Sequence, residues 1–375
     1  MKVYYPDIFE SFHCIGSECK DNCCKIGWDI EIDNNTLAFY RSLKDDMGKR
    51  LCDAIYEEDG CHYMGQDGGC PFLNEKGLCS VLLKYGEDKI SEICAQHPRF
   101  YEWFGGYKEA GVGLSCEEVS RLLCTHSQPI KFYEKHTDEA DDTLEYNKVI
   151  FNAVKEIRDN LIKLMQDKGL DTKQKLYVIL HTAIDLQNCL DEENEDDLDE
   201  VADILCDKKY IERVLSSAKT DGSKAEKKKI YEGILTYFKG LDYLHDDFLN
   251  MLCEAEKNLD RIIDNEDSFD KFYRFREYEY ENLAIYFIYR YLLKATRDYD
   301  GYSKLLYAAV SVILVRLVDM NEYSKTGRLD VATQIFIVKE YSKEVEYSAE
   351  NAENIFDDLY CDSRFAVDNL RKLLM

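Results

Sequence analysis

The chain has 375 residues, of which 45% are hydrophobic and 33% are charged, so it is long enough for two globular domains. Its net charge of −26 and the lack of a prominent basic stretch argue against nucleic-acid binding, which requires a basic face. The longest apolar run, residues 305–315, is too short to cross a bilayer, and the first residues carry no signal-peptide pattern. We therefore expect a cytoplasmic protein without a membrane span.

Residues 1–128 are predicted to form a loop-rich first domain. The alternating segment WDIEID at 28–33 is typical of a strand, and the helical period of residues 36–55 predicts a helix. The glycine-rich residues 59–79 are expected to be one long loop. A segment with so little regular structure needs an additional source of stability.

Residues 129–375 are predicted to form an all-helical second domain. In residues 149–165, apolar side chains recur at steps of four and three, which indicates one face of a helix. Asp171 and Gln174 have the spacing of a capping box for the next helix. The acidic residues 191–200 are expected to form an exposed loop that leads into a helix. Further helical patterns occupy residues 228–264, 270–297, 303–320 and 330–346.

Nine tyrosines lie at helical spacing between residues 273 and 307. Packing, with the hydroxyl groups at the rim of the core, is the favoured interpretation; a binding surface is the alternative.

The cysteines are concentrated in the first domain, where eleven of the fifteen fall within residues 1–124. A reducing cytosol disfavours a disulfide framework, so metal binding or redox chemistry is the better interpretation of this density. Their spacing does not match paired zinc-finger knuckles or the ferredoxin run. The C-x3-C-x2-C signature of radical S-adenosylmethionine enzymes fails because position 26 is isoleucine.

Cys23 and Cys24 are adjacent, which is informative in itself. Such a pair serves two sides of a turn, supplies two separate centres, or consists of one ligand and one buried thiol. Three later residues are weaker candidates. His97 is a ligand or, more plausibly, an orienting or structural residue, and Arg99 either holds a carboxylate or forms a structural ion pair. The glycines before Cys116 would allow a bulky cofactor to approach the backbone.

These motifs together resemble the flagellin lysine-N-methylase family, which includes a cysteine-rich region described as zinc- or iron-chelating. The resemblance rests on YPDIFESFHCIGSECKDNCC-x3-WDIEID, CPFL-x4-GLC, C-x3-PR and SC, within residues 4–124. Weaker similarities follow in ENLAIYFIYRYL near 281–292 and YSKEVEYSAEN near 341–351.

The resemblance implies an enzyme that uses S-adenosylmethionine to methylate surface lysines of flagellin. It also implies a four-iron four-sulfur cluster, with zinc as the alternative. The metal-ligand candidates that it carries over are Cys14, Cys19, Cys23, Cys24, Cys70, Cys79, Cys94 and Cys116. We expect these sulfurs, with Cys23 or Cys24 from the adjacent pair, to gather in one region. Lying away from it should be Cys52, Cys61, Cys124, Cys189, Cys206, Cys253 and Cys361.

The methyl-donor site is less defined because the sequence lacks the glycine-rich fingerprint of a Rossmann-type methyltransferase. Aromatic faces suit a sulfonium cation, and Trp28, Trp103 and the tyrosine-rich helix are candidates. The competing hypothesis is a non-catalytic zinc or iron–sulfur protein whose helical domain binds a partner.

Overall fold

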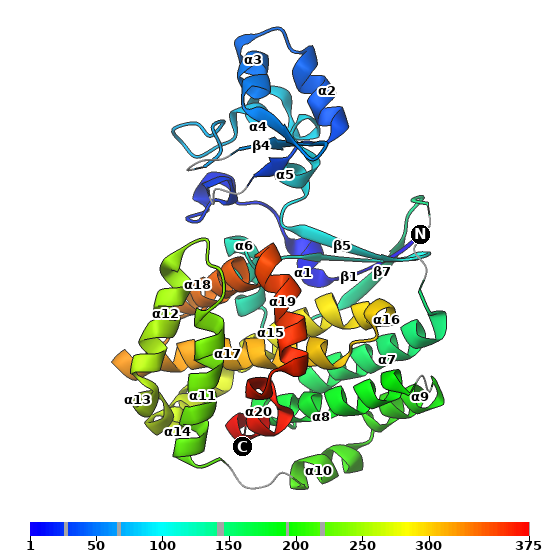
Figure 1. Cartoon of the computed structure of the whole chain (residues 1–375), viewed down its shortest axis with the longest axis vertical. Helices are drawn as coiled ribbons and strands as arrows, with labels where there is room; N and C mark the ends of the chain where they lie inside the picture. Colours follow the sequence, from blue (N-terminus) through cyan, green and yellow to red (C-terminus); the bar gives the residue numbers. More distant parts are fainter. Residues whose placement is uncertain (26–28, 66–68, 141–145, 193–194, 218–221, 375) are drawn as a thin grey trace.

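A computed structural model gives the fold and describes residues 1–25, 29–65, 69–140, 146–192, 195–217 and 222–374. The chain is mainly helical, as the sequence predicts, and the described strands all lie before residue 137. Figure 1 shows a small lobe, coloured blue to cyan, standing on a larger helical body. The dark-blue turn that precedes the first grey segment lies where the lobe meets the body.

The body contains a four-stranded sheet in the order β5-β6-β1-β7. Its strands are β1 (Lys2–Pro6), β5 (Arg99–Phe104), β6 (Tyr107–Val112) and β7 (Phe132–His136). β1 runs parallel to β6 and antiparallel to β7, whereas β5 and β6 form an antiparallel hairpin. The chain therefore leaves the body after α1 (Asp7–Ser11), builds the lobe and returns to the same sheet at β5.

The lobe combines short helices with a second, three-stranded sheet in the order β2-β4-β3. Its elements are β2 (Ile30–Glu31), α2 (Asn34–Ser42), α3 (Asp46–Asp53), β3 (Ile55–Glu58), β4 (Cys61–Met64), α4 (Ser80–Tyr85), the 3-10 turn η3 (Glu87–Lys89) and α5 (Glu92–Gln96). The strand expected at 28–33 is confirmed only at Ile30–Glu31, and residue 28 lies outside the described residues. The prediction of a single loop over residues 59–79 was wrong at the start of this stretch, where β4 pairs with both β2 and β3.

The helix expected over residues 36–55 is in fact two helices. The helix α2 ends at Ser42, and Asp45 caps the start of α3 by accepting a hydrogen bond of 2.9 Å from the Gly48 backbone N–H. An aspartate at an N-cap satisfies one of the free N–H groups of a first turn. The helical period of the sequence continued across this break because both helices bury apolar side chains in the same core.

The helices of the body are α6 (Glu117–Thr125), α7 (Lys148–Met165), α8 (Thr172–Asp191), α9 (Glu195–Ile204), α10 (Lys208–Ser216), α11 (Lys224–Lys239), α12 (Asp246–Lys257), α13 (Leu259–Asp264), α14 (Glu266–Tyr273), α15 (Tyr278–Tyr291), α16 (Ala295–Asp298), α17 (Tyr302–Thr326), α18 (Val331–Tyr341), α19 (Ala349–Cys361) and α20 (Val367–Leu374). The predicted helix at 149–165 and its successor's capping box are confirmed, with reciprocal bonds of 2.8 and 3.0 Å between Asp171 and Gln174. The helices α6, α10, α19 and α20 were not predicted, and the acidic stretch expected as a loop at 191–200 is helical from Glu195, where α9 begins.

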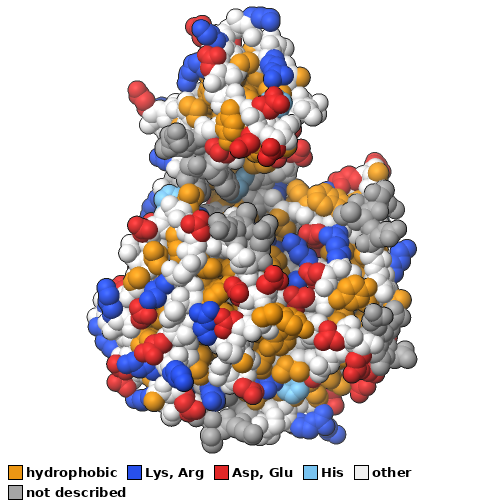
Figure 2. Space-filling model, viewed as in Figure 1, with side chains coloured by type: hydrophobic (Ala, Val, Ile, Leu, Met, Phe, Trp, Pro, Cys, Tyr) orange, Lys and Arg blue, Asp and Glu red, His pale blue; other side chains and the backbone are white. Residues whose placement is uncertain are grey.

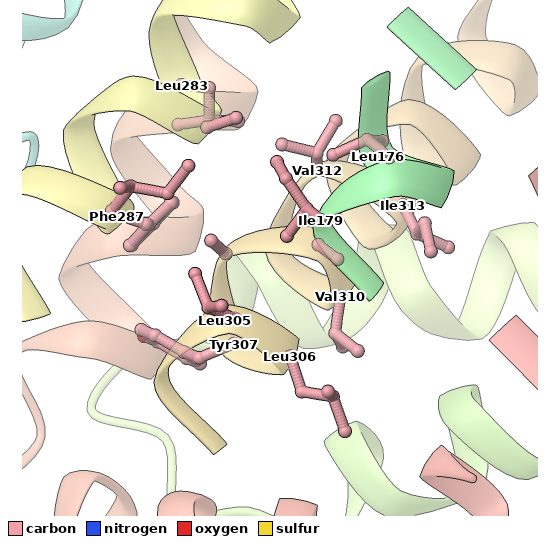
Figure 3. Close-up of a cluster of buried hydrophobic side chains, with 14 of the residues drawn as sticks. Leu176, Ile179, Leu283, Phe287, Leu305, Leu306, Tyr307, Val310, Val312 and Ile313 are labelled. Atoms are coloured by element: carbon pink, nitrogen blue, oxygen red, sulfur yellow. The ribbon is translucent and has the colours of Figure 1, made fainter. Parts of the chain in front are cut away.

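The helix α17 is the centre of the body. Leu305, Leu306, Val310 and Val312 are fully buried, and Figure 3 shows them among side chains of α8 and α15. A helix that is hydrophobic nearly all round belongs to the interior of a large core. Among the described residues, no helix combines the length and the apolar character that crossing a bilayer requires.

The tyrosines between residues 273 and 307 are mostly core residues, as expected, but their hydroxyl groups do not lie at a rim. Tyr280 donates to Asp319 at 2.5 Å, and both Tyr286 and Tyr291 donate to Glu346 at 2.8 and 2.9 Å. All five side chains are buried. The hydroxyl groups therefore serve as the partners of buried carboxylates, which would otherwise be costly to desolvate.

The buried hydrophobic side chains form two main cores. One core lies inside the lobe. The members of this core are Ile30, Ile32, Leu37, Tyr40, Leu51, Met64, Phe72 and Val81. The other core extends from Ile8 to Leu374 and includes side chains of the four-stranded sheet, such as Phe104 and Val112. The predicted division into residues 1–128 and 129–375 stays a prediction.

Candidate metal centre

The loop from Cys70 to Cys79 presents two thiols of the lobe beside Cys24. The Cys70 backbone N–H donates to the Cys24 carbonyl oxygen at 2.7 Å, so the two segments are in direct contact. The loop closes on itself through a bridge between Leu73 and Cys79, and its turn uses Gly77 at a φ of +72°. Cys79 then caps α4, since its Sγ accepts a bond of 3.4 Å from the Leu82 N–H.

Cys94 joins these three cysteines from α5. Ser91 caps this helix by accepting a bond of 3.3 Å from the Cys94 N–H. The charges of Cys24, Cys70 and Cys79 all act on the Cys94 thiol, and desolvation raises its pKa to about 11. Desolvation likewise raises the pKa of Cys70 to about 11, with smaller contributions from Cys24 and Cys79. The backbone contact and these interactions place the four thiols near one another.

Cys19 and Cys116 lie close to each other at the start of α6. Cys116 is the residue before this helix, and Glu117 is its first residue. One carboxylate oxygen of Glu117 accepts bonds from the Lys20 and Asp21 N–H groups at 2.8 and 3.1 Å, and the Cys19 Sγ lies 3.6 Å from it. Glu117 thereby holds the turn that carries Cys19 against the helix that carries Cys116.

Electrostatic interactions also link Cys14 and Cys23 to Cys116. The hydrogen bond to Cys24 and burial raise the pKa of Cys23, the charges of Cys24, Cys116 and Cys14 add to this, and Cys14 also acts on Cys116. Burial, followed by the charge of Glu117, raises the pKa of Cys19 to about 12. The backbone supports this placement, because α1, which ends three residues before Cys14, packs against α6.

Cys23 and Cys24 interact with each other within the short 3-10 turn η2 (Cys23–Lys25). The hydrogen bond from Cys23 lowers the pKa of Cys24 to about 7 and raises that of Cys23. Cys24 is therefore the thiol of this pair that ionises more readily, and thiolates are the metal-binding form of cysteine.

The eight predicted ligands thus lie on neighbouring segments around the junction where the lobe meets the body. All fifteen cysteines are free thiols, so none of the eight is paired in a disulfide. Cys124 is buried in the core of the body, and Cys52 is exposed on the last turn of α3. No three His, Cys, Asp or Glu side chains within the described ranges are placed closely enough to share a single metal ion. The thiols suit a soft metal by their chemistry, and the binding role of the eight stays a prediction.

His97 and Arg99 are placed next to this region. Burial lowers the pKa of His97 to about 4, so the imidazole is neutral at physiological pH. The Arg99 guanidinium lies 5.2 Å from the centre of the Phe12 ring, which is the geometry of a cation–π contact. Arg99 therefore has a packing role in addition to its charge.

The sequence did not reveal how the helical body holds the cysteine-rich turn. The Asp21 carboxylate accepts bonds from Lys339 at 2.5 Å and from Lys343 at 3.2 Å. Although burial opposes ionisation, these bonds hold the pKa of Asp21 below its usual value. Lys343 lies in the π-helix η6 (Ser342–Glu346), and π-helical turns are frequent at functional sites. The only available signal was the similarity of residues 341–351 to the family.

The aromatic residues considered for the methyl-donor site lie in different parts of the chain. Trp28 lies outside the described residues, and Trp103 is partly exposed with the Lys108 ammonium 5.0 Å from its ring centre. A cavity of about 160 Å³ lies in the helical body, lined by Tyr231, Phe269, Tyr273, Tyr280, Asp270 and Arg316. That volume is below the range of pockets that enclose a ligand as large as S-adenosylmethionine.

The face shown in Figure 2 carries interspersed acidic and basic side chains over the body. Such mixed surfaces are typical of a protein kept in solution by charge and do not by themselves identify a partner.

The chain is similar to a known protein family and to individual proteins of Salmonella. A family model described as "FliB lysine N-methylase C-terminal domain" matches residues 158–375, more than half of the chain. A lysine-N-methylase of Salmonella typhimurium is 23% identical over 144 residues, which is 36% of this chain and 35% of that protein. A flagellar biosynthetic protein FliU of Salmonella muenchen is 31% identical over 133 residues, which is 32% of this chain and 76% of that protein. The match thus spans about a third of the length of the lysine-N-methylase. No solved structure matches the chain.

Proposed function

Because the chain belongs to the FliB lysine N-methylase family, we propose that it methylates lysine side chains of flagellin with S-adenosylmethionine as the donor. The family match over residues 158–375 is the observation that carries this proposal. The printed name of the Salmonella relative supports the reaction, and the flagellar name of the shorter relative supports the substrate.

The reaction has simple requirements. The neutral lysine nitrogen attacks the sulfonium methyl group, a nitrogen–carbon bond forms, and the carbon–sulfur bond breaks to release S-adenosylhomocysteine. The substrate ammonium must lose its proton before the attack, and this calls for a desolvating site or a base.

We further propose that the thiols at the junction hold iron and sulfide. Four cysteine thiolates are the usual ligands of a four-iron four-sulfur cluster, which supplies electron transfer when it is bound. Zinc, the alternative, needs four ligands around one ion at about 2.3 Å, and that arrangement is not preformed among the described side chains. Free thiols at this density also fit a reducing compartment, so the proposed location is the cytoplasm.

The test is methyl transfer to flagellin from the same cell. Anaerobically purified, iron-replete protein is incubated with flagellin and S-adenosylmethionine, and intact-mass spectrometry follows the flagellin. We expect mass increases in multiples of one methyl group, located on lysines. A flagellin with unchanged mass would contradict the proposal. If the protein still bound flagellin without transfer, it would favour the non-catalytic metal protein instead.

A further inference from the structure

The strand β7 is one edge of the four-stranded sheet, on the side of the body that carries the lobe (Figure 1). We propose that this edge binds an extended segment of flagellin, which adds a further strand to the sheet through its backbone. The site follows from the pairing of β7, and the identity of the partner rests on the proposed function.

The pairing with β1 decides which backbone groups of β7 are used. At one end the Thr137 N–H donates to the Met1 carbonyl oxygen at 2.9 Å, and at the other end the Asp7 N–H donates to the Lys131 carbonyl oxygen at 2.8 Å. Hydrogen-bonded pairs recur at every second residue of an antiparallel ladder, so the odd-numbered residues of 131–137 face β1. The N–H and C=O groups of the residues between them point away from the sheet. These outward residues are Phe132, Glu134 and His136.

The outward backbone groups of β7 are available for pairing. No hydrogen bond among the described residues reaches the backbone N–H or C=O groups of Phe132, Glu134 or His136. Four of the five β7 residues are exposed, so another strand can approach. The other edge of the sheet, β5, is partly closed, because the Arg297 guanidinium donates to the Trp103 carbonyl oxygen. An exposed edge with unpaired N–H and C=O groups is a template for another strand.

The side chains along this edge define what an incoming strand should carry. Lys131, Tyr133 and Lys135 alternate along the chain and therefore share one face of the sheet. Tyr133 is 44% exposed and packs on Tyr5, with 6.1 Å between the ring centres. Neither lysine forms an ion pair within the described ranges. Because opposite charges and aromatic–apolar pairs stabilise neighbouring strands, the matching segment has an apolar residue between two carboxylates at alternate positions.

A second copy of the chain does not match this edge. Two β7 strands that pair antiparallel through their outward groups have three registers with long overlap. These registers place Glu134 opposite Glu134, Lys131 opposite Lys135, or Lys135 opposite Lys135. Like charges directly opposite each other destabilise a strand pair. The occupant is therefore a different chain, and flagellin is the partner that the proposed function supplies.

Proline at an outward position tests the edge. Glu134→Pro removes one free N–H and leaves the hydrogen bonds between β1 and β7 intact, since proline is tolerated on an edge strand where its nitrogen faces solvent. Glu134→Ala is the matched variant, because it keeps the N–H while both variants lose the exposed pair with Lys2. We expect flagellin from the same cell to bind Glu134→Pro about tenfold more weakly than Glu134→Ala in titration calorimetry. Urea unfolding of both variants shows whether the fold is kept.

Hydrogen exchange of the wild-type chain covers the case in which the proline variant is unstable. In the free protein the outward N–H groups of Glu134 and His136 should exchange fast and the inward N–H group of Lys135 slowly, because only the inward group bonds to β1. Bound flagellin should slow the exchange of the outward groups. Unchanged exchange there, equal affinities of the proline and alanine variants, or a dimer of the free chain that Glu134→Pro disrupts would overturn the proposal.

A synthetic peptide separates this proposal from the proposed function. A peptide with a valine between two glutamates at alternate positions should slow the exchange of the Glu134 N–H, and its counterpart with lysines in place of the glutamates should not. Protection by the acidic peptide together with no methyl transfer to bound flagellin would refute only the proposed function. Methyl transfer without protection of β7 by flagellin would refute only the docking at this edge.

Discussion

Glu117 shows how a single carboxylate positions a ligand-bearing turn. Its Oε2 accepts two backbone N–H groups at 2.8 and 3.1 Å and lies 3.6 Å from the Cys19 sulfur. The bonds join residues that are almost a hundred positions apart. The cysteines could be predicted from their density and spacing, but Glu117 could not, because its role depends on a long-range contact that no local pattern encodes.

We expect Glu117→Ala to destabilise the turn by about 1–3 kcal/mol, because the Lys20 and Asp21 N–H groups lose a charged acceptor. Iron content after reconstitution should fall, and Glu117→Gln should restore part of it, since an amide oxygen still accepts. The matched control is Glu118→Gln on the same helix, which disturbs a pair with Arg121 and leaves the turn intact. Equal iron loss in both variants would show that Glu117 has no special role.

Glu266 gives a pH-dependent prediction. It is buried between Lys173, Lys227 and Arg316, with contacts of 2.9, 3.1 and 3.3 Å, and these cations outweigh burial and lower its pKa to about 2. A lowered folded-state pKa stabilises the fold above the ordinary carboxyl pKa, and this stabilisation is lost as the pH falls toward 2.

Glu266→Gln should therefore reduce the free energy of unfolding by on the order of 3 kcal/mol at pH 7. The difference in the free energy of unfolding between the variant and wild type should become smaller as the pH is lowered below about 4.5. Urea unfolding midpoints of both proteins, measured between pH 7 and pH 3.5, will test this. Asp260→Asn, which removes an exposed partner of Lys228, should change the midpoint little at any pH. A gap that stays constant with pH would contradict the assignment.

At the scale of elements, long periodic helices were predictable and short ones were not. The helix α7 and the cap of α8 follow from local signals that agree with the fold. The helices α10 and α20 have nine and eight residues and α19 has 13, and helices of this length depend on tertiary packing for stability. The break between α2 and α3 was missed because the apolar period continued through it.

The capping box of α8 can be tested directly. Asp171→Ala removes the side-chain acceptor for the Gln174 N–H, and we expect a loss of about 1 kcal/mol in the free energy of unfolding. Gln174→Ala removes only the reciprocal bond and should cost less. Denaturant unfolding of both variants measures the difference, and a larger loss for Gln174→Ala would contradict the capping role of Asp171.

The lobe and the body are linked by ion pairs that connect distant parts of the chain. Lys339 is 4% exposed and donates to Asp21 from more than 300 residues away. We expect Lys339→Met to cost about 1.5–3 kcal/mol, since a partly buried carboxylate loses a charged donor. Faster proteolysis of residues 14–25 should accompany the loss.

The control for this link is Lys2→Met, which removes an exposed pair with Glu134 on neighbouring strands. Exposed pairs contribute about 0–1 kcal/mol, so this variant should resemble wild type. Unchanged proteolysis in Lys339→Met would mean that other contacts alone hold the turn.

At the scale of the whole molecule, the sequence indicated a change of character near residue 128, whereas the side-chain packing separates the lobe core from a core that includes the sheet. Because the lobe lies between β1 and β7 in the sequence, no local pattern could show that these two strands share one sheet. The mainly helical class was predictable, and the insertion of the lobe was not.

Removal of metal should make the lobe unfold at a lower temperature than the body. The lobe core is small, so the proposed metal centre would contribute much of its folding free energy. We expect protein treated with an iron chelator to show an early, separate unfolding transition for the lobe in calorimetry, while the main transition of the body stays within a few degrees. A single transition that shifts as a whole would contradict this division.

The position of β1 between β6 and β7 also decides what holds the molecule together after its backbone is cut. Strands on both sides of β1 come from beyond the lobe, so the first residues are retained by hydrogen bonds and packing as well as by covalent continuity. We therefore expect a nick in the lobe to leave two fragments that the sheet still holds together. The pairing of β1 with β6 and β7, more than the continuity of the backbone, then keeps the first strand in the molecule.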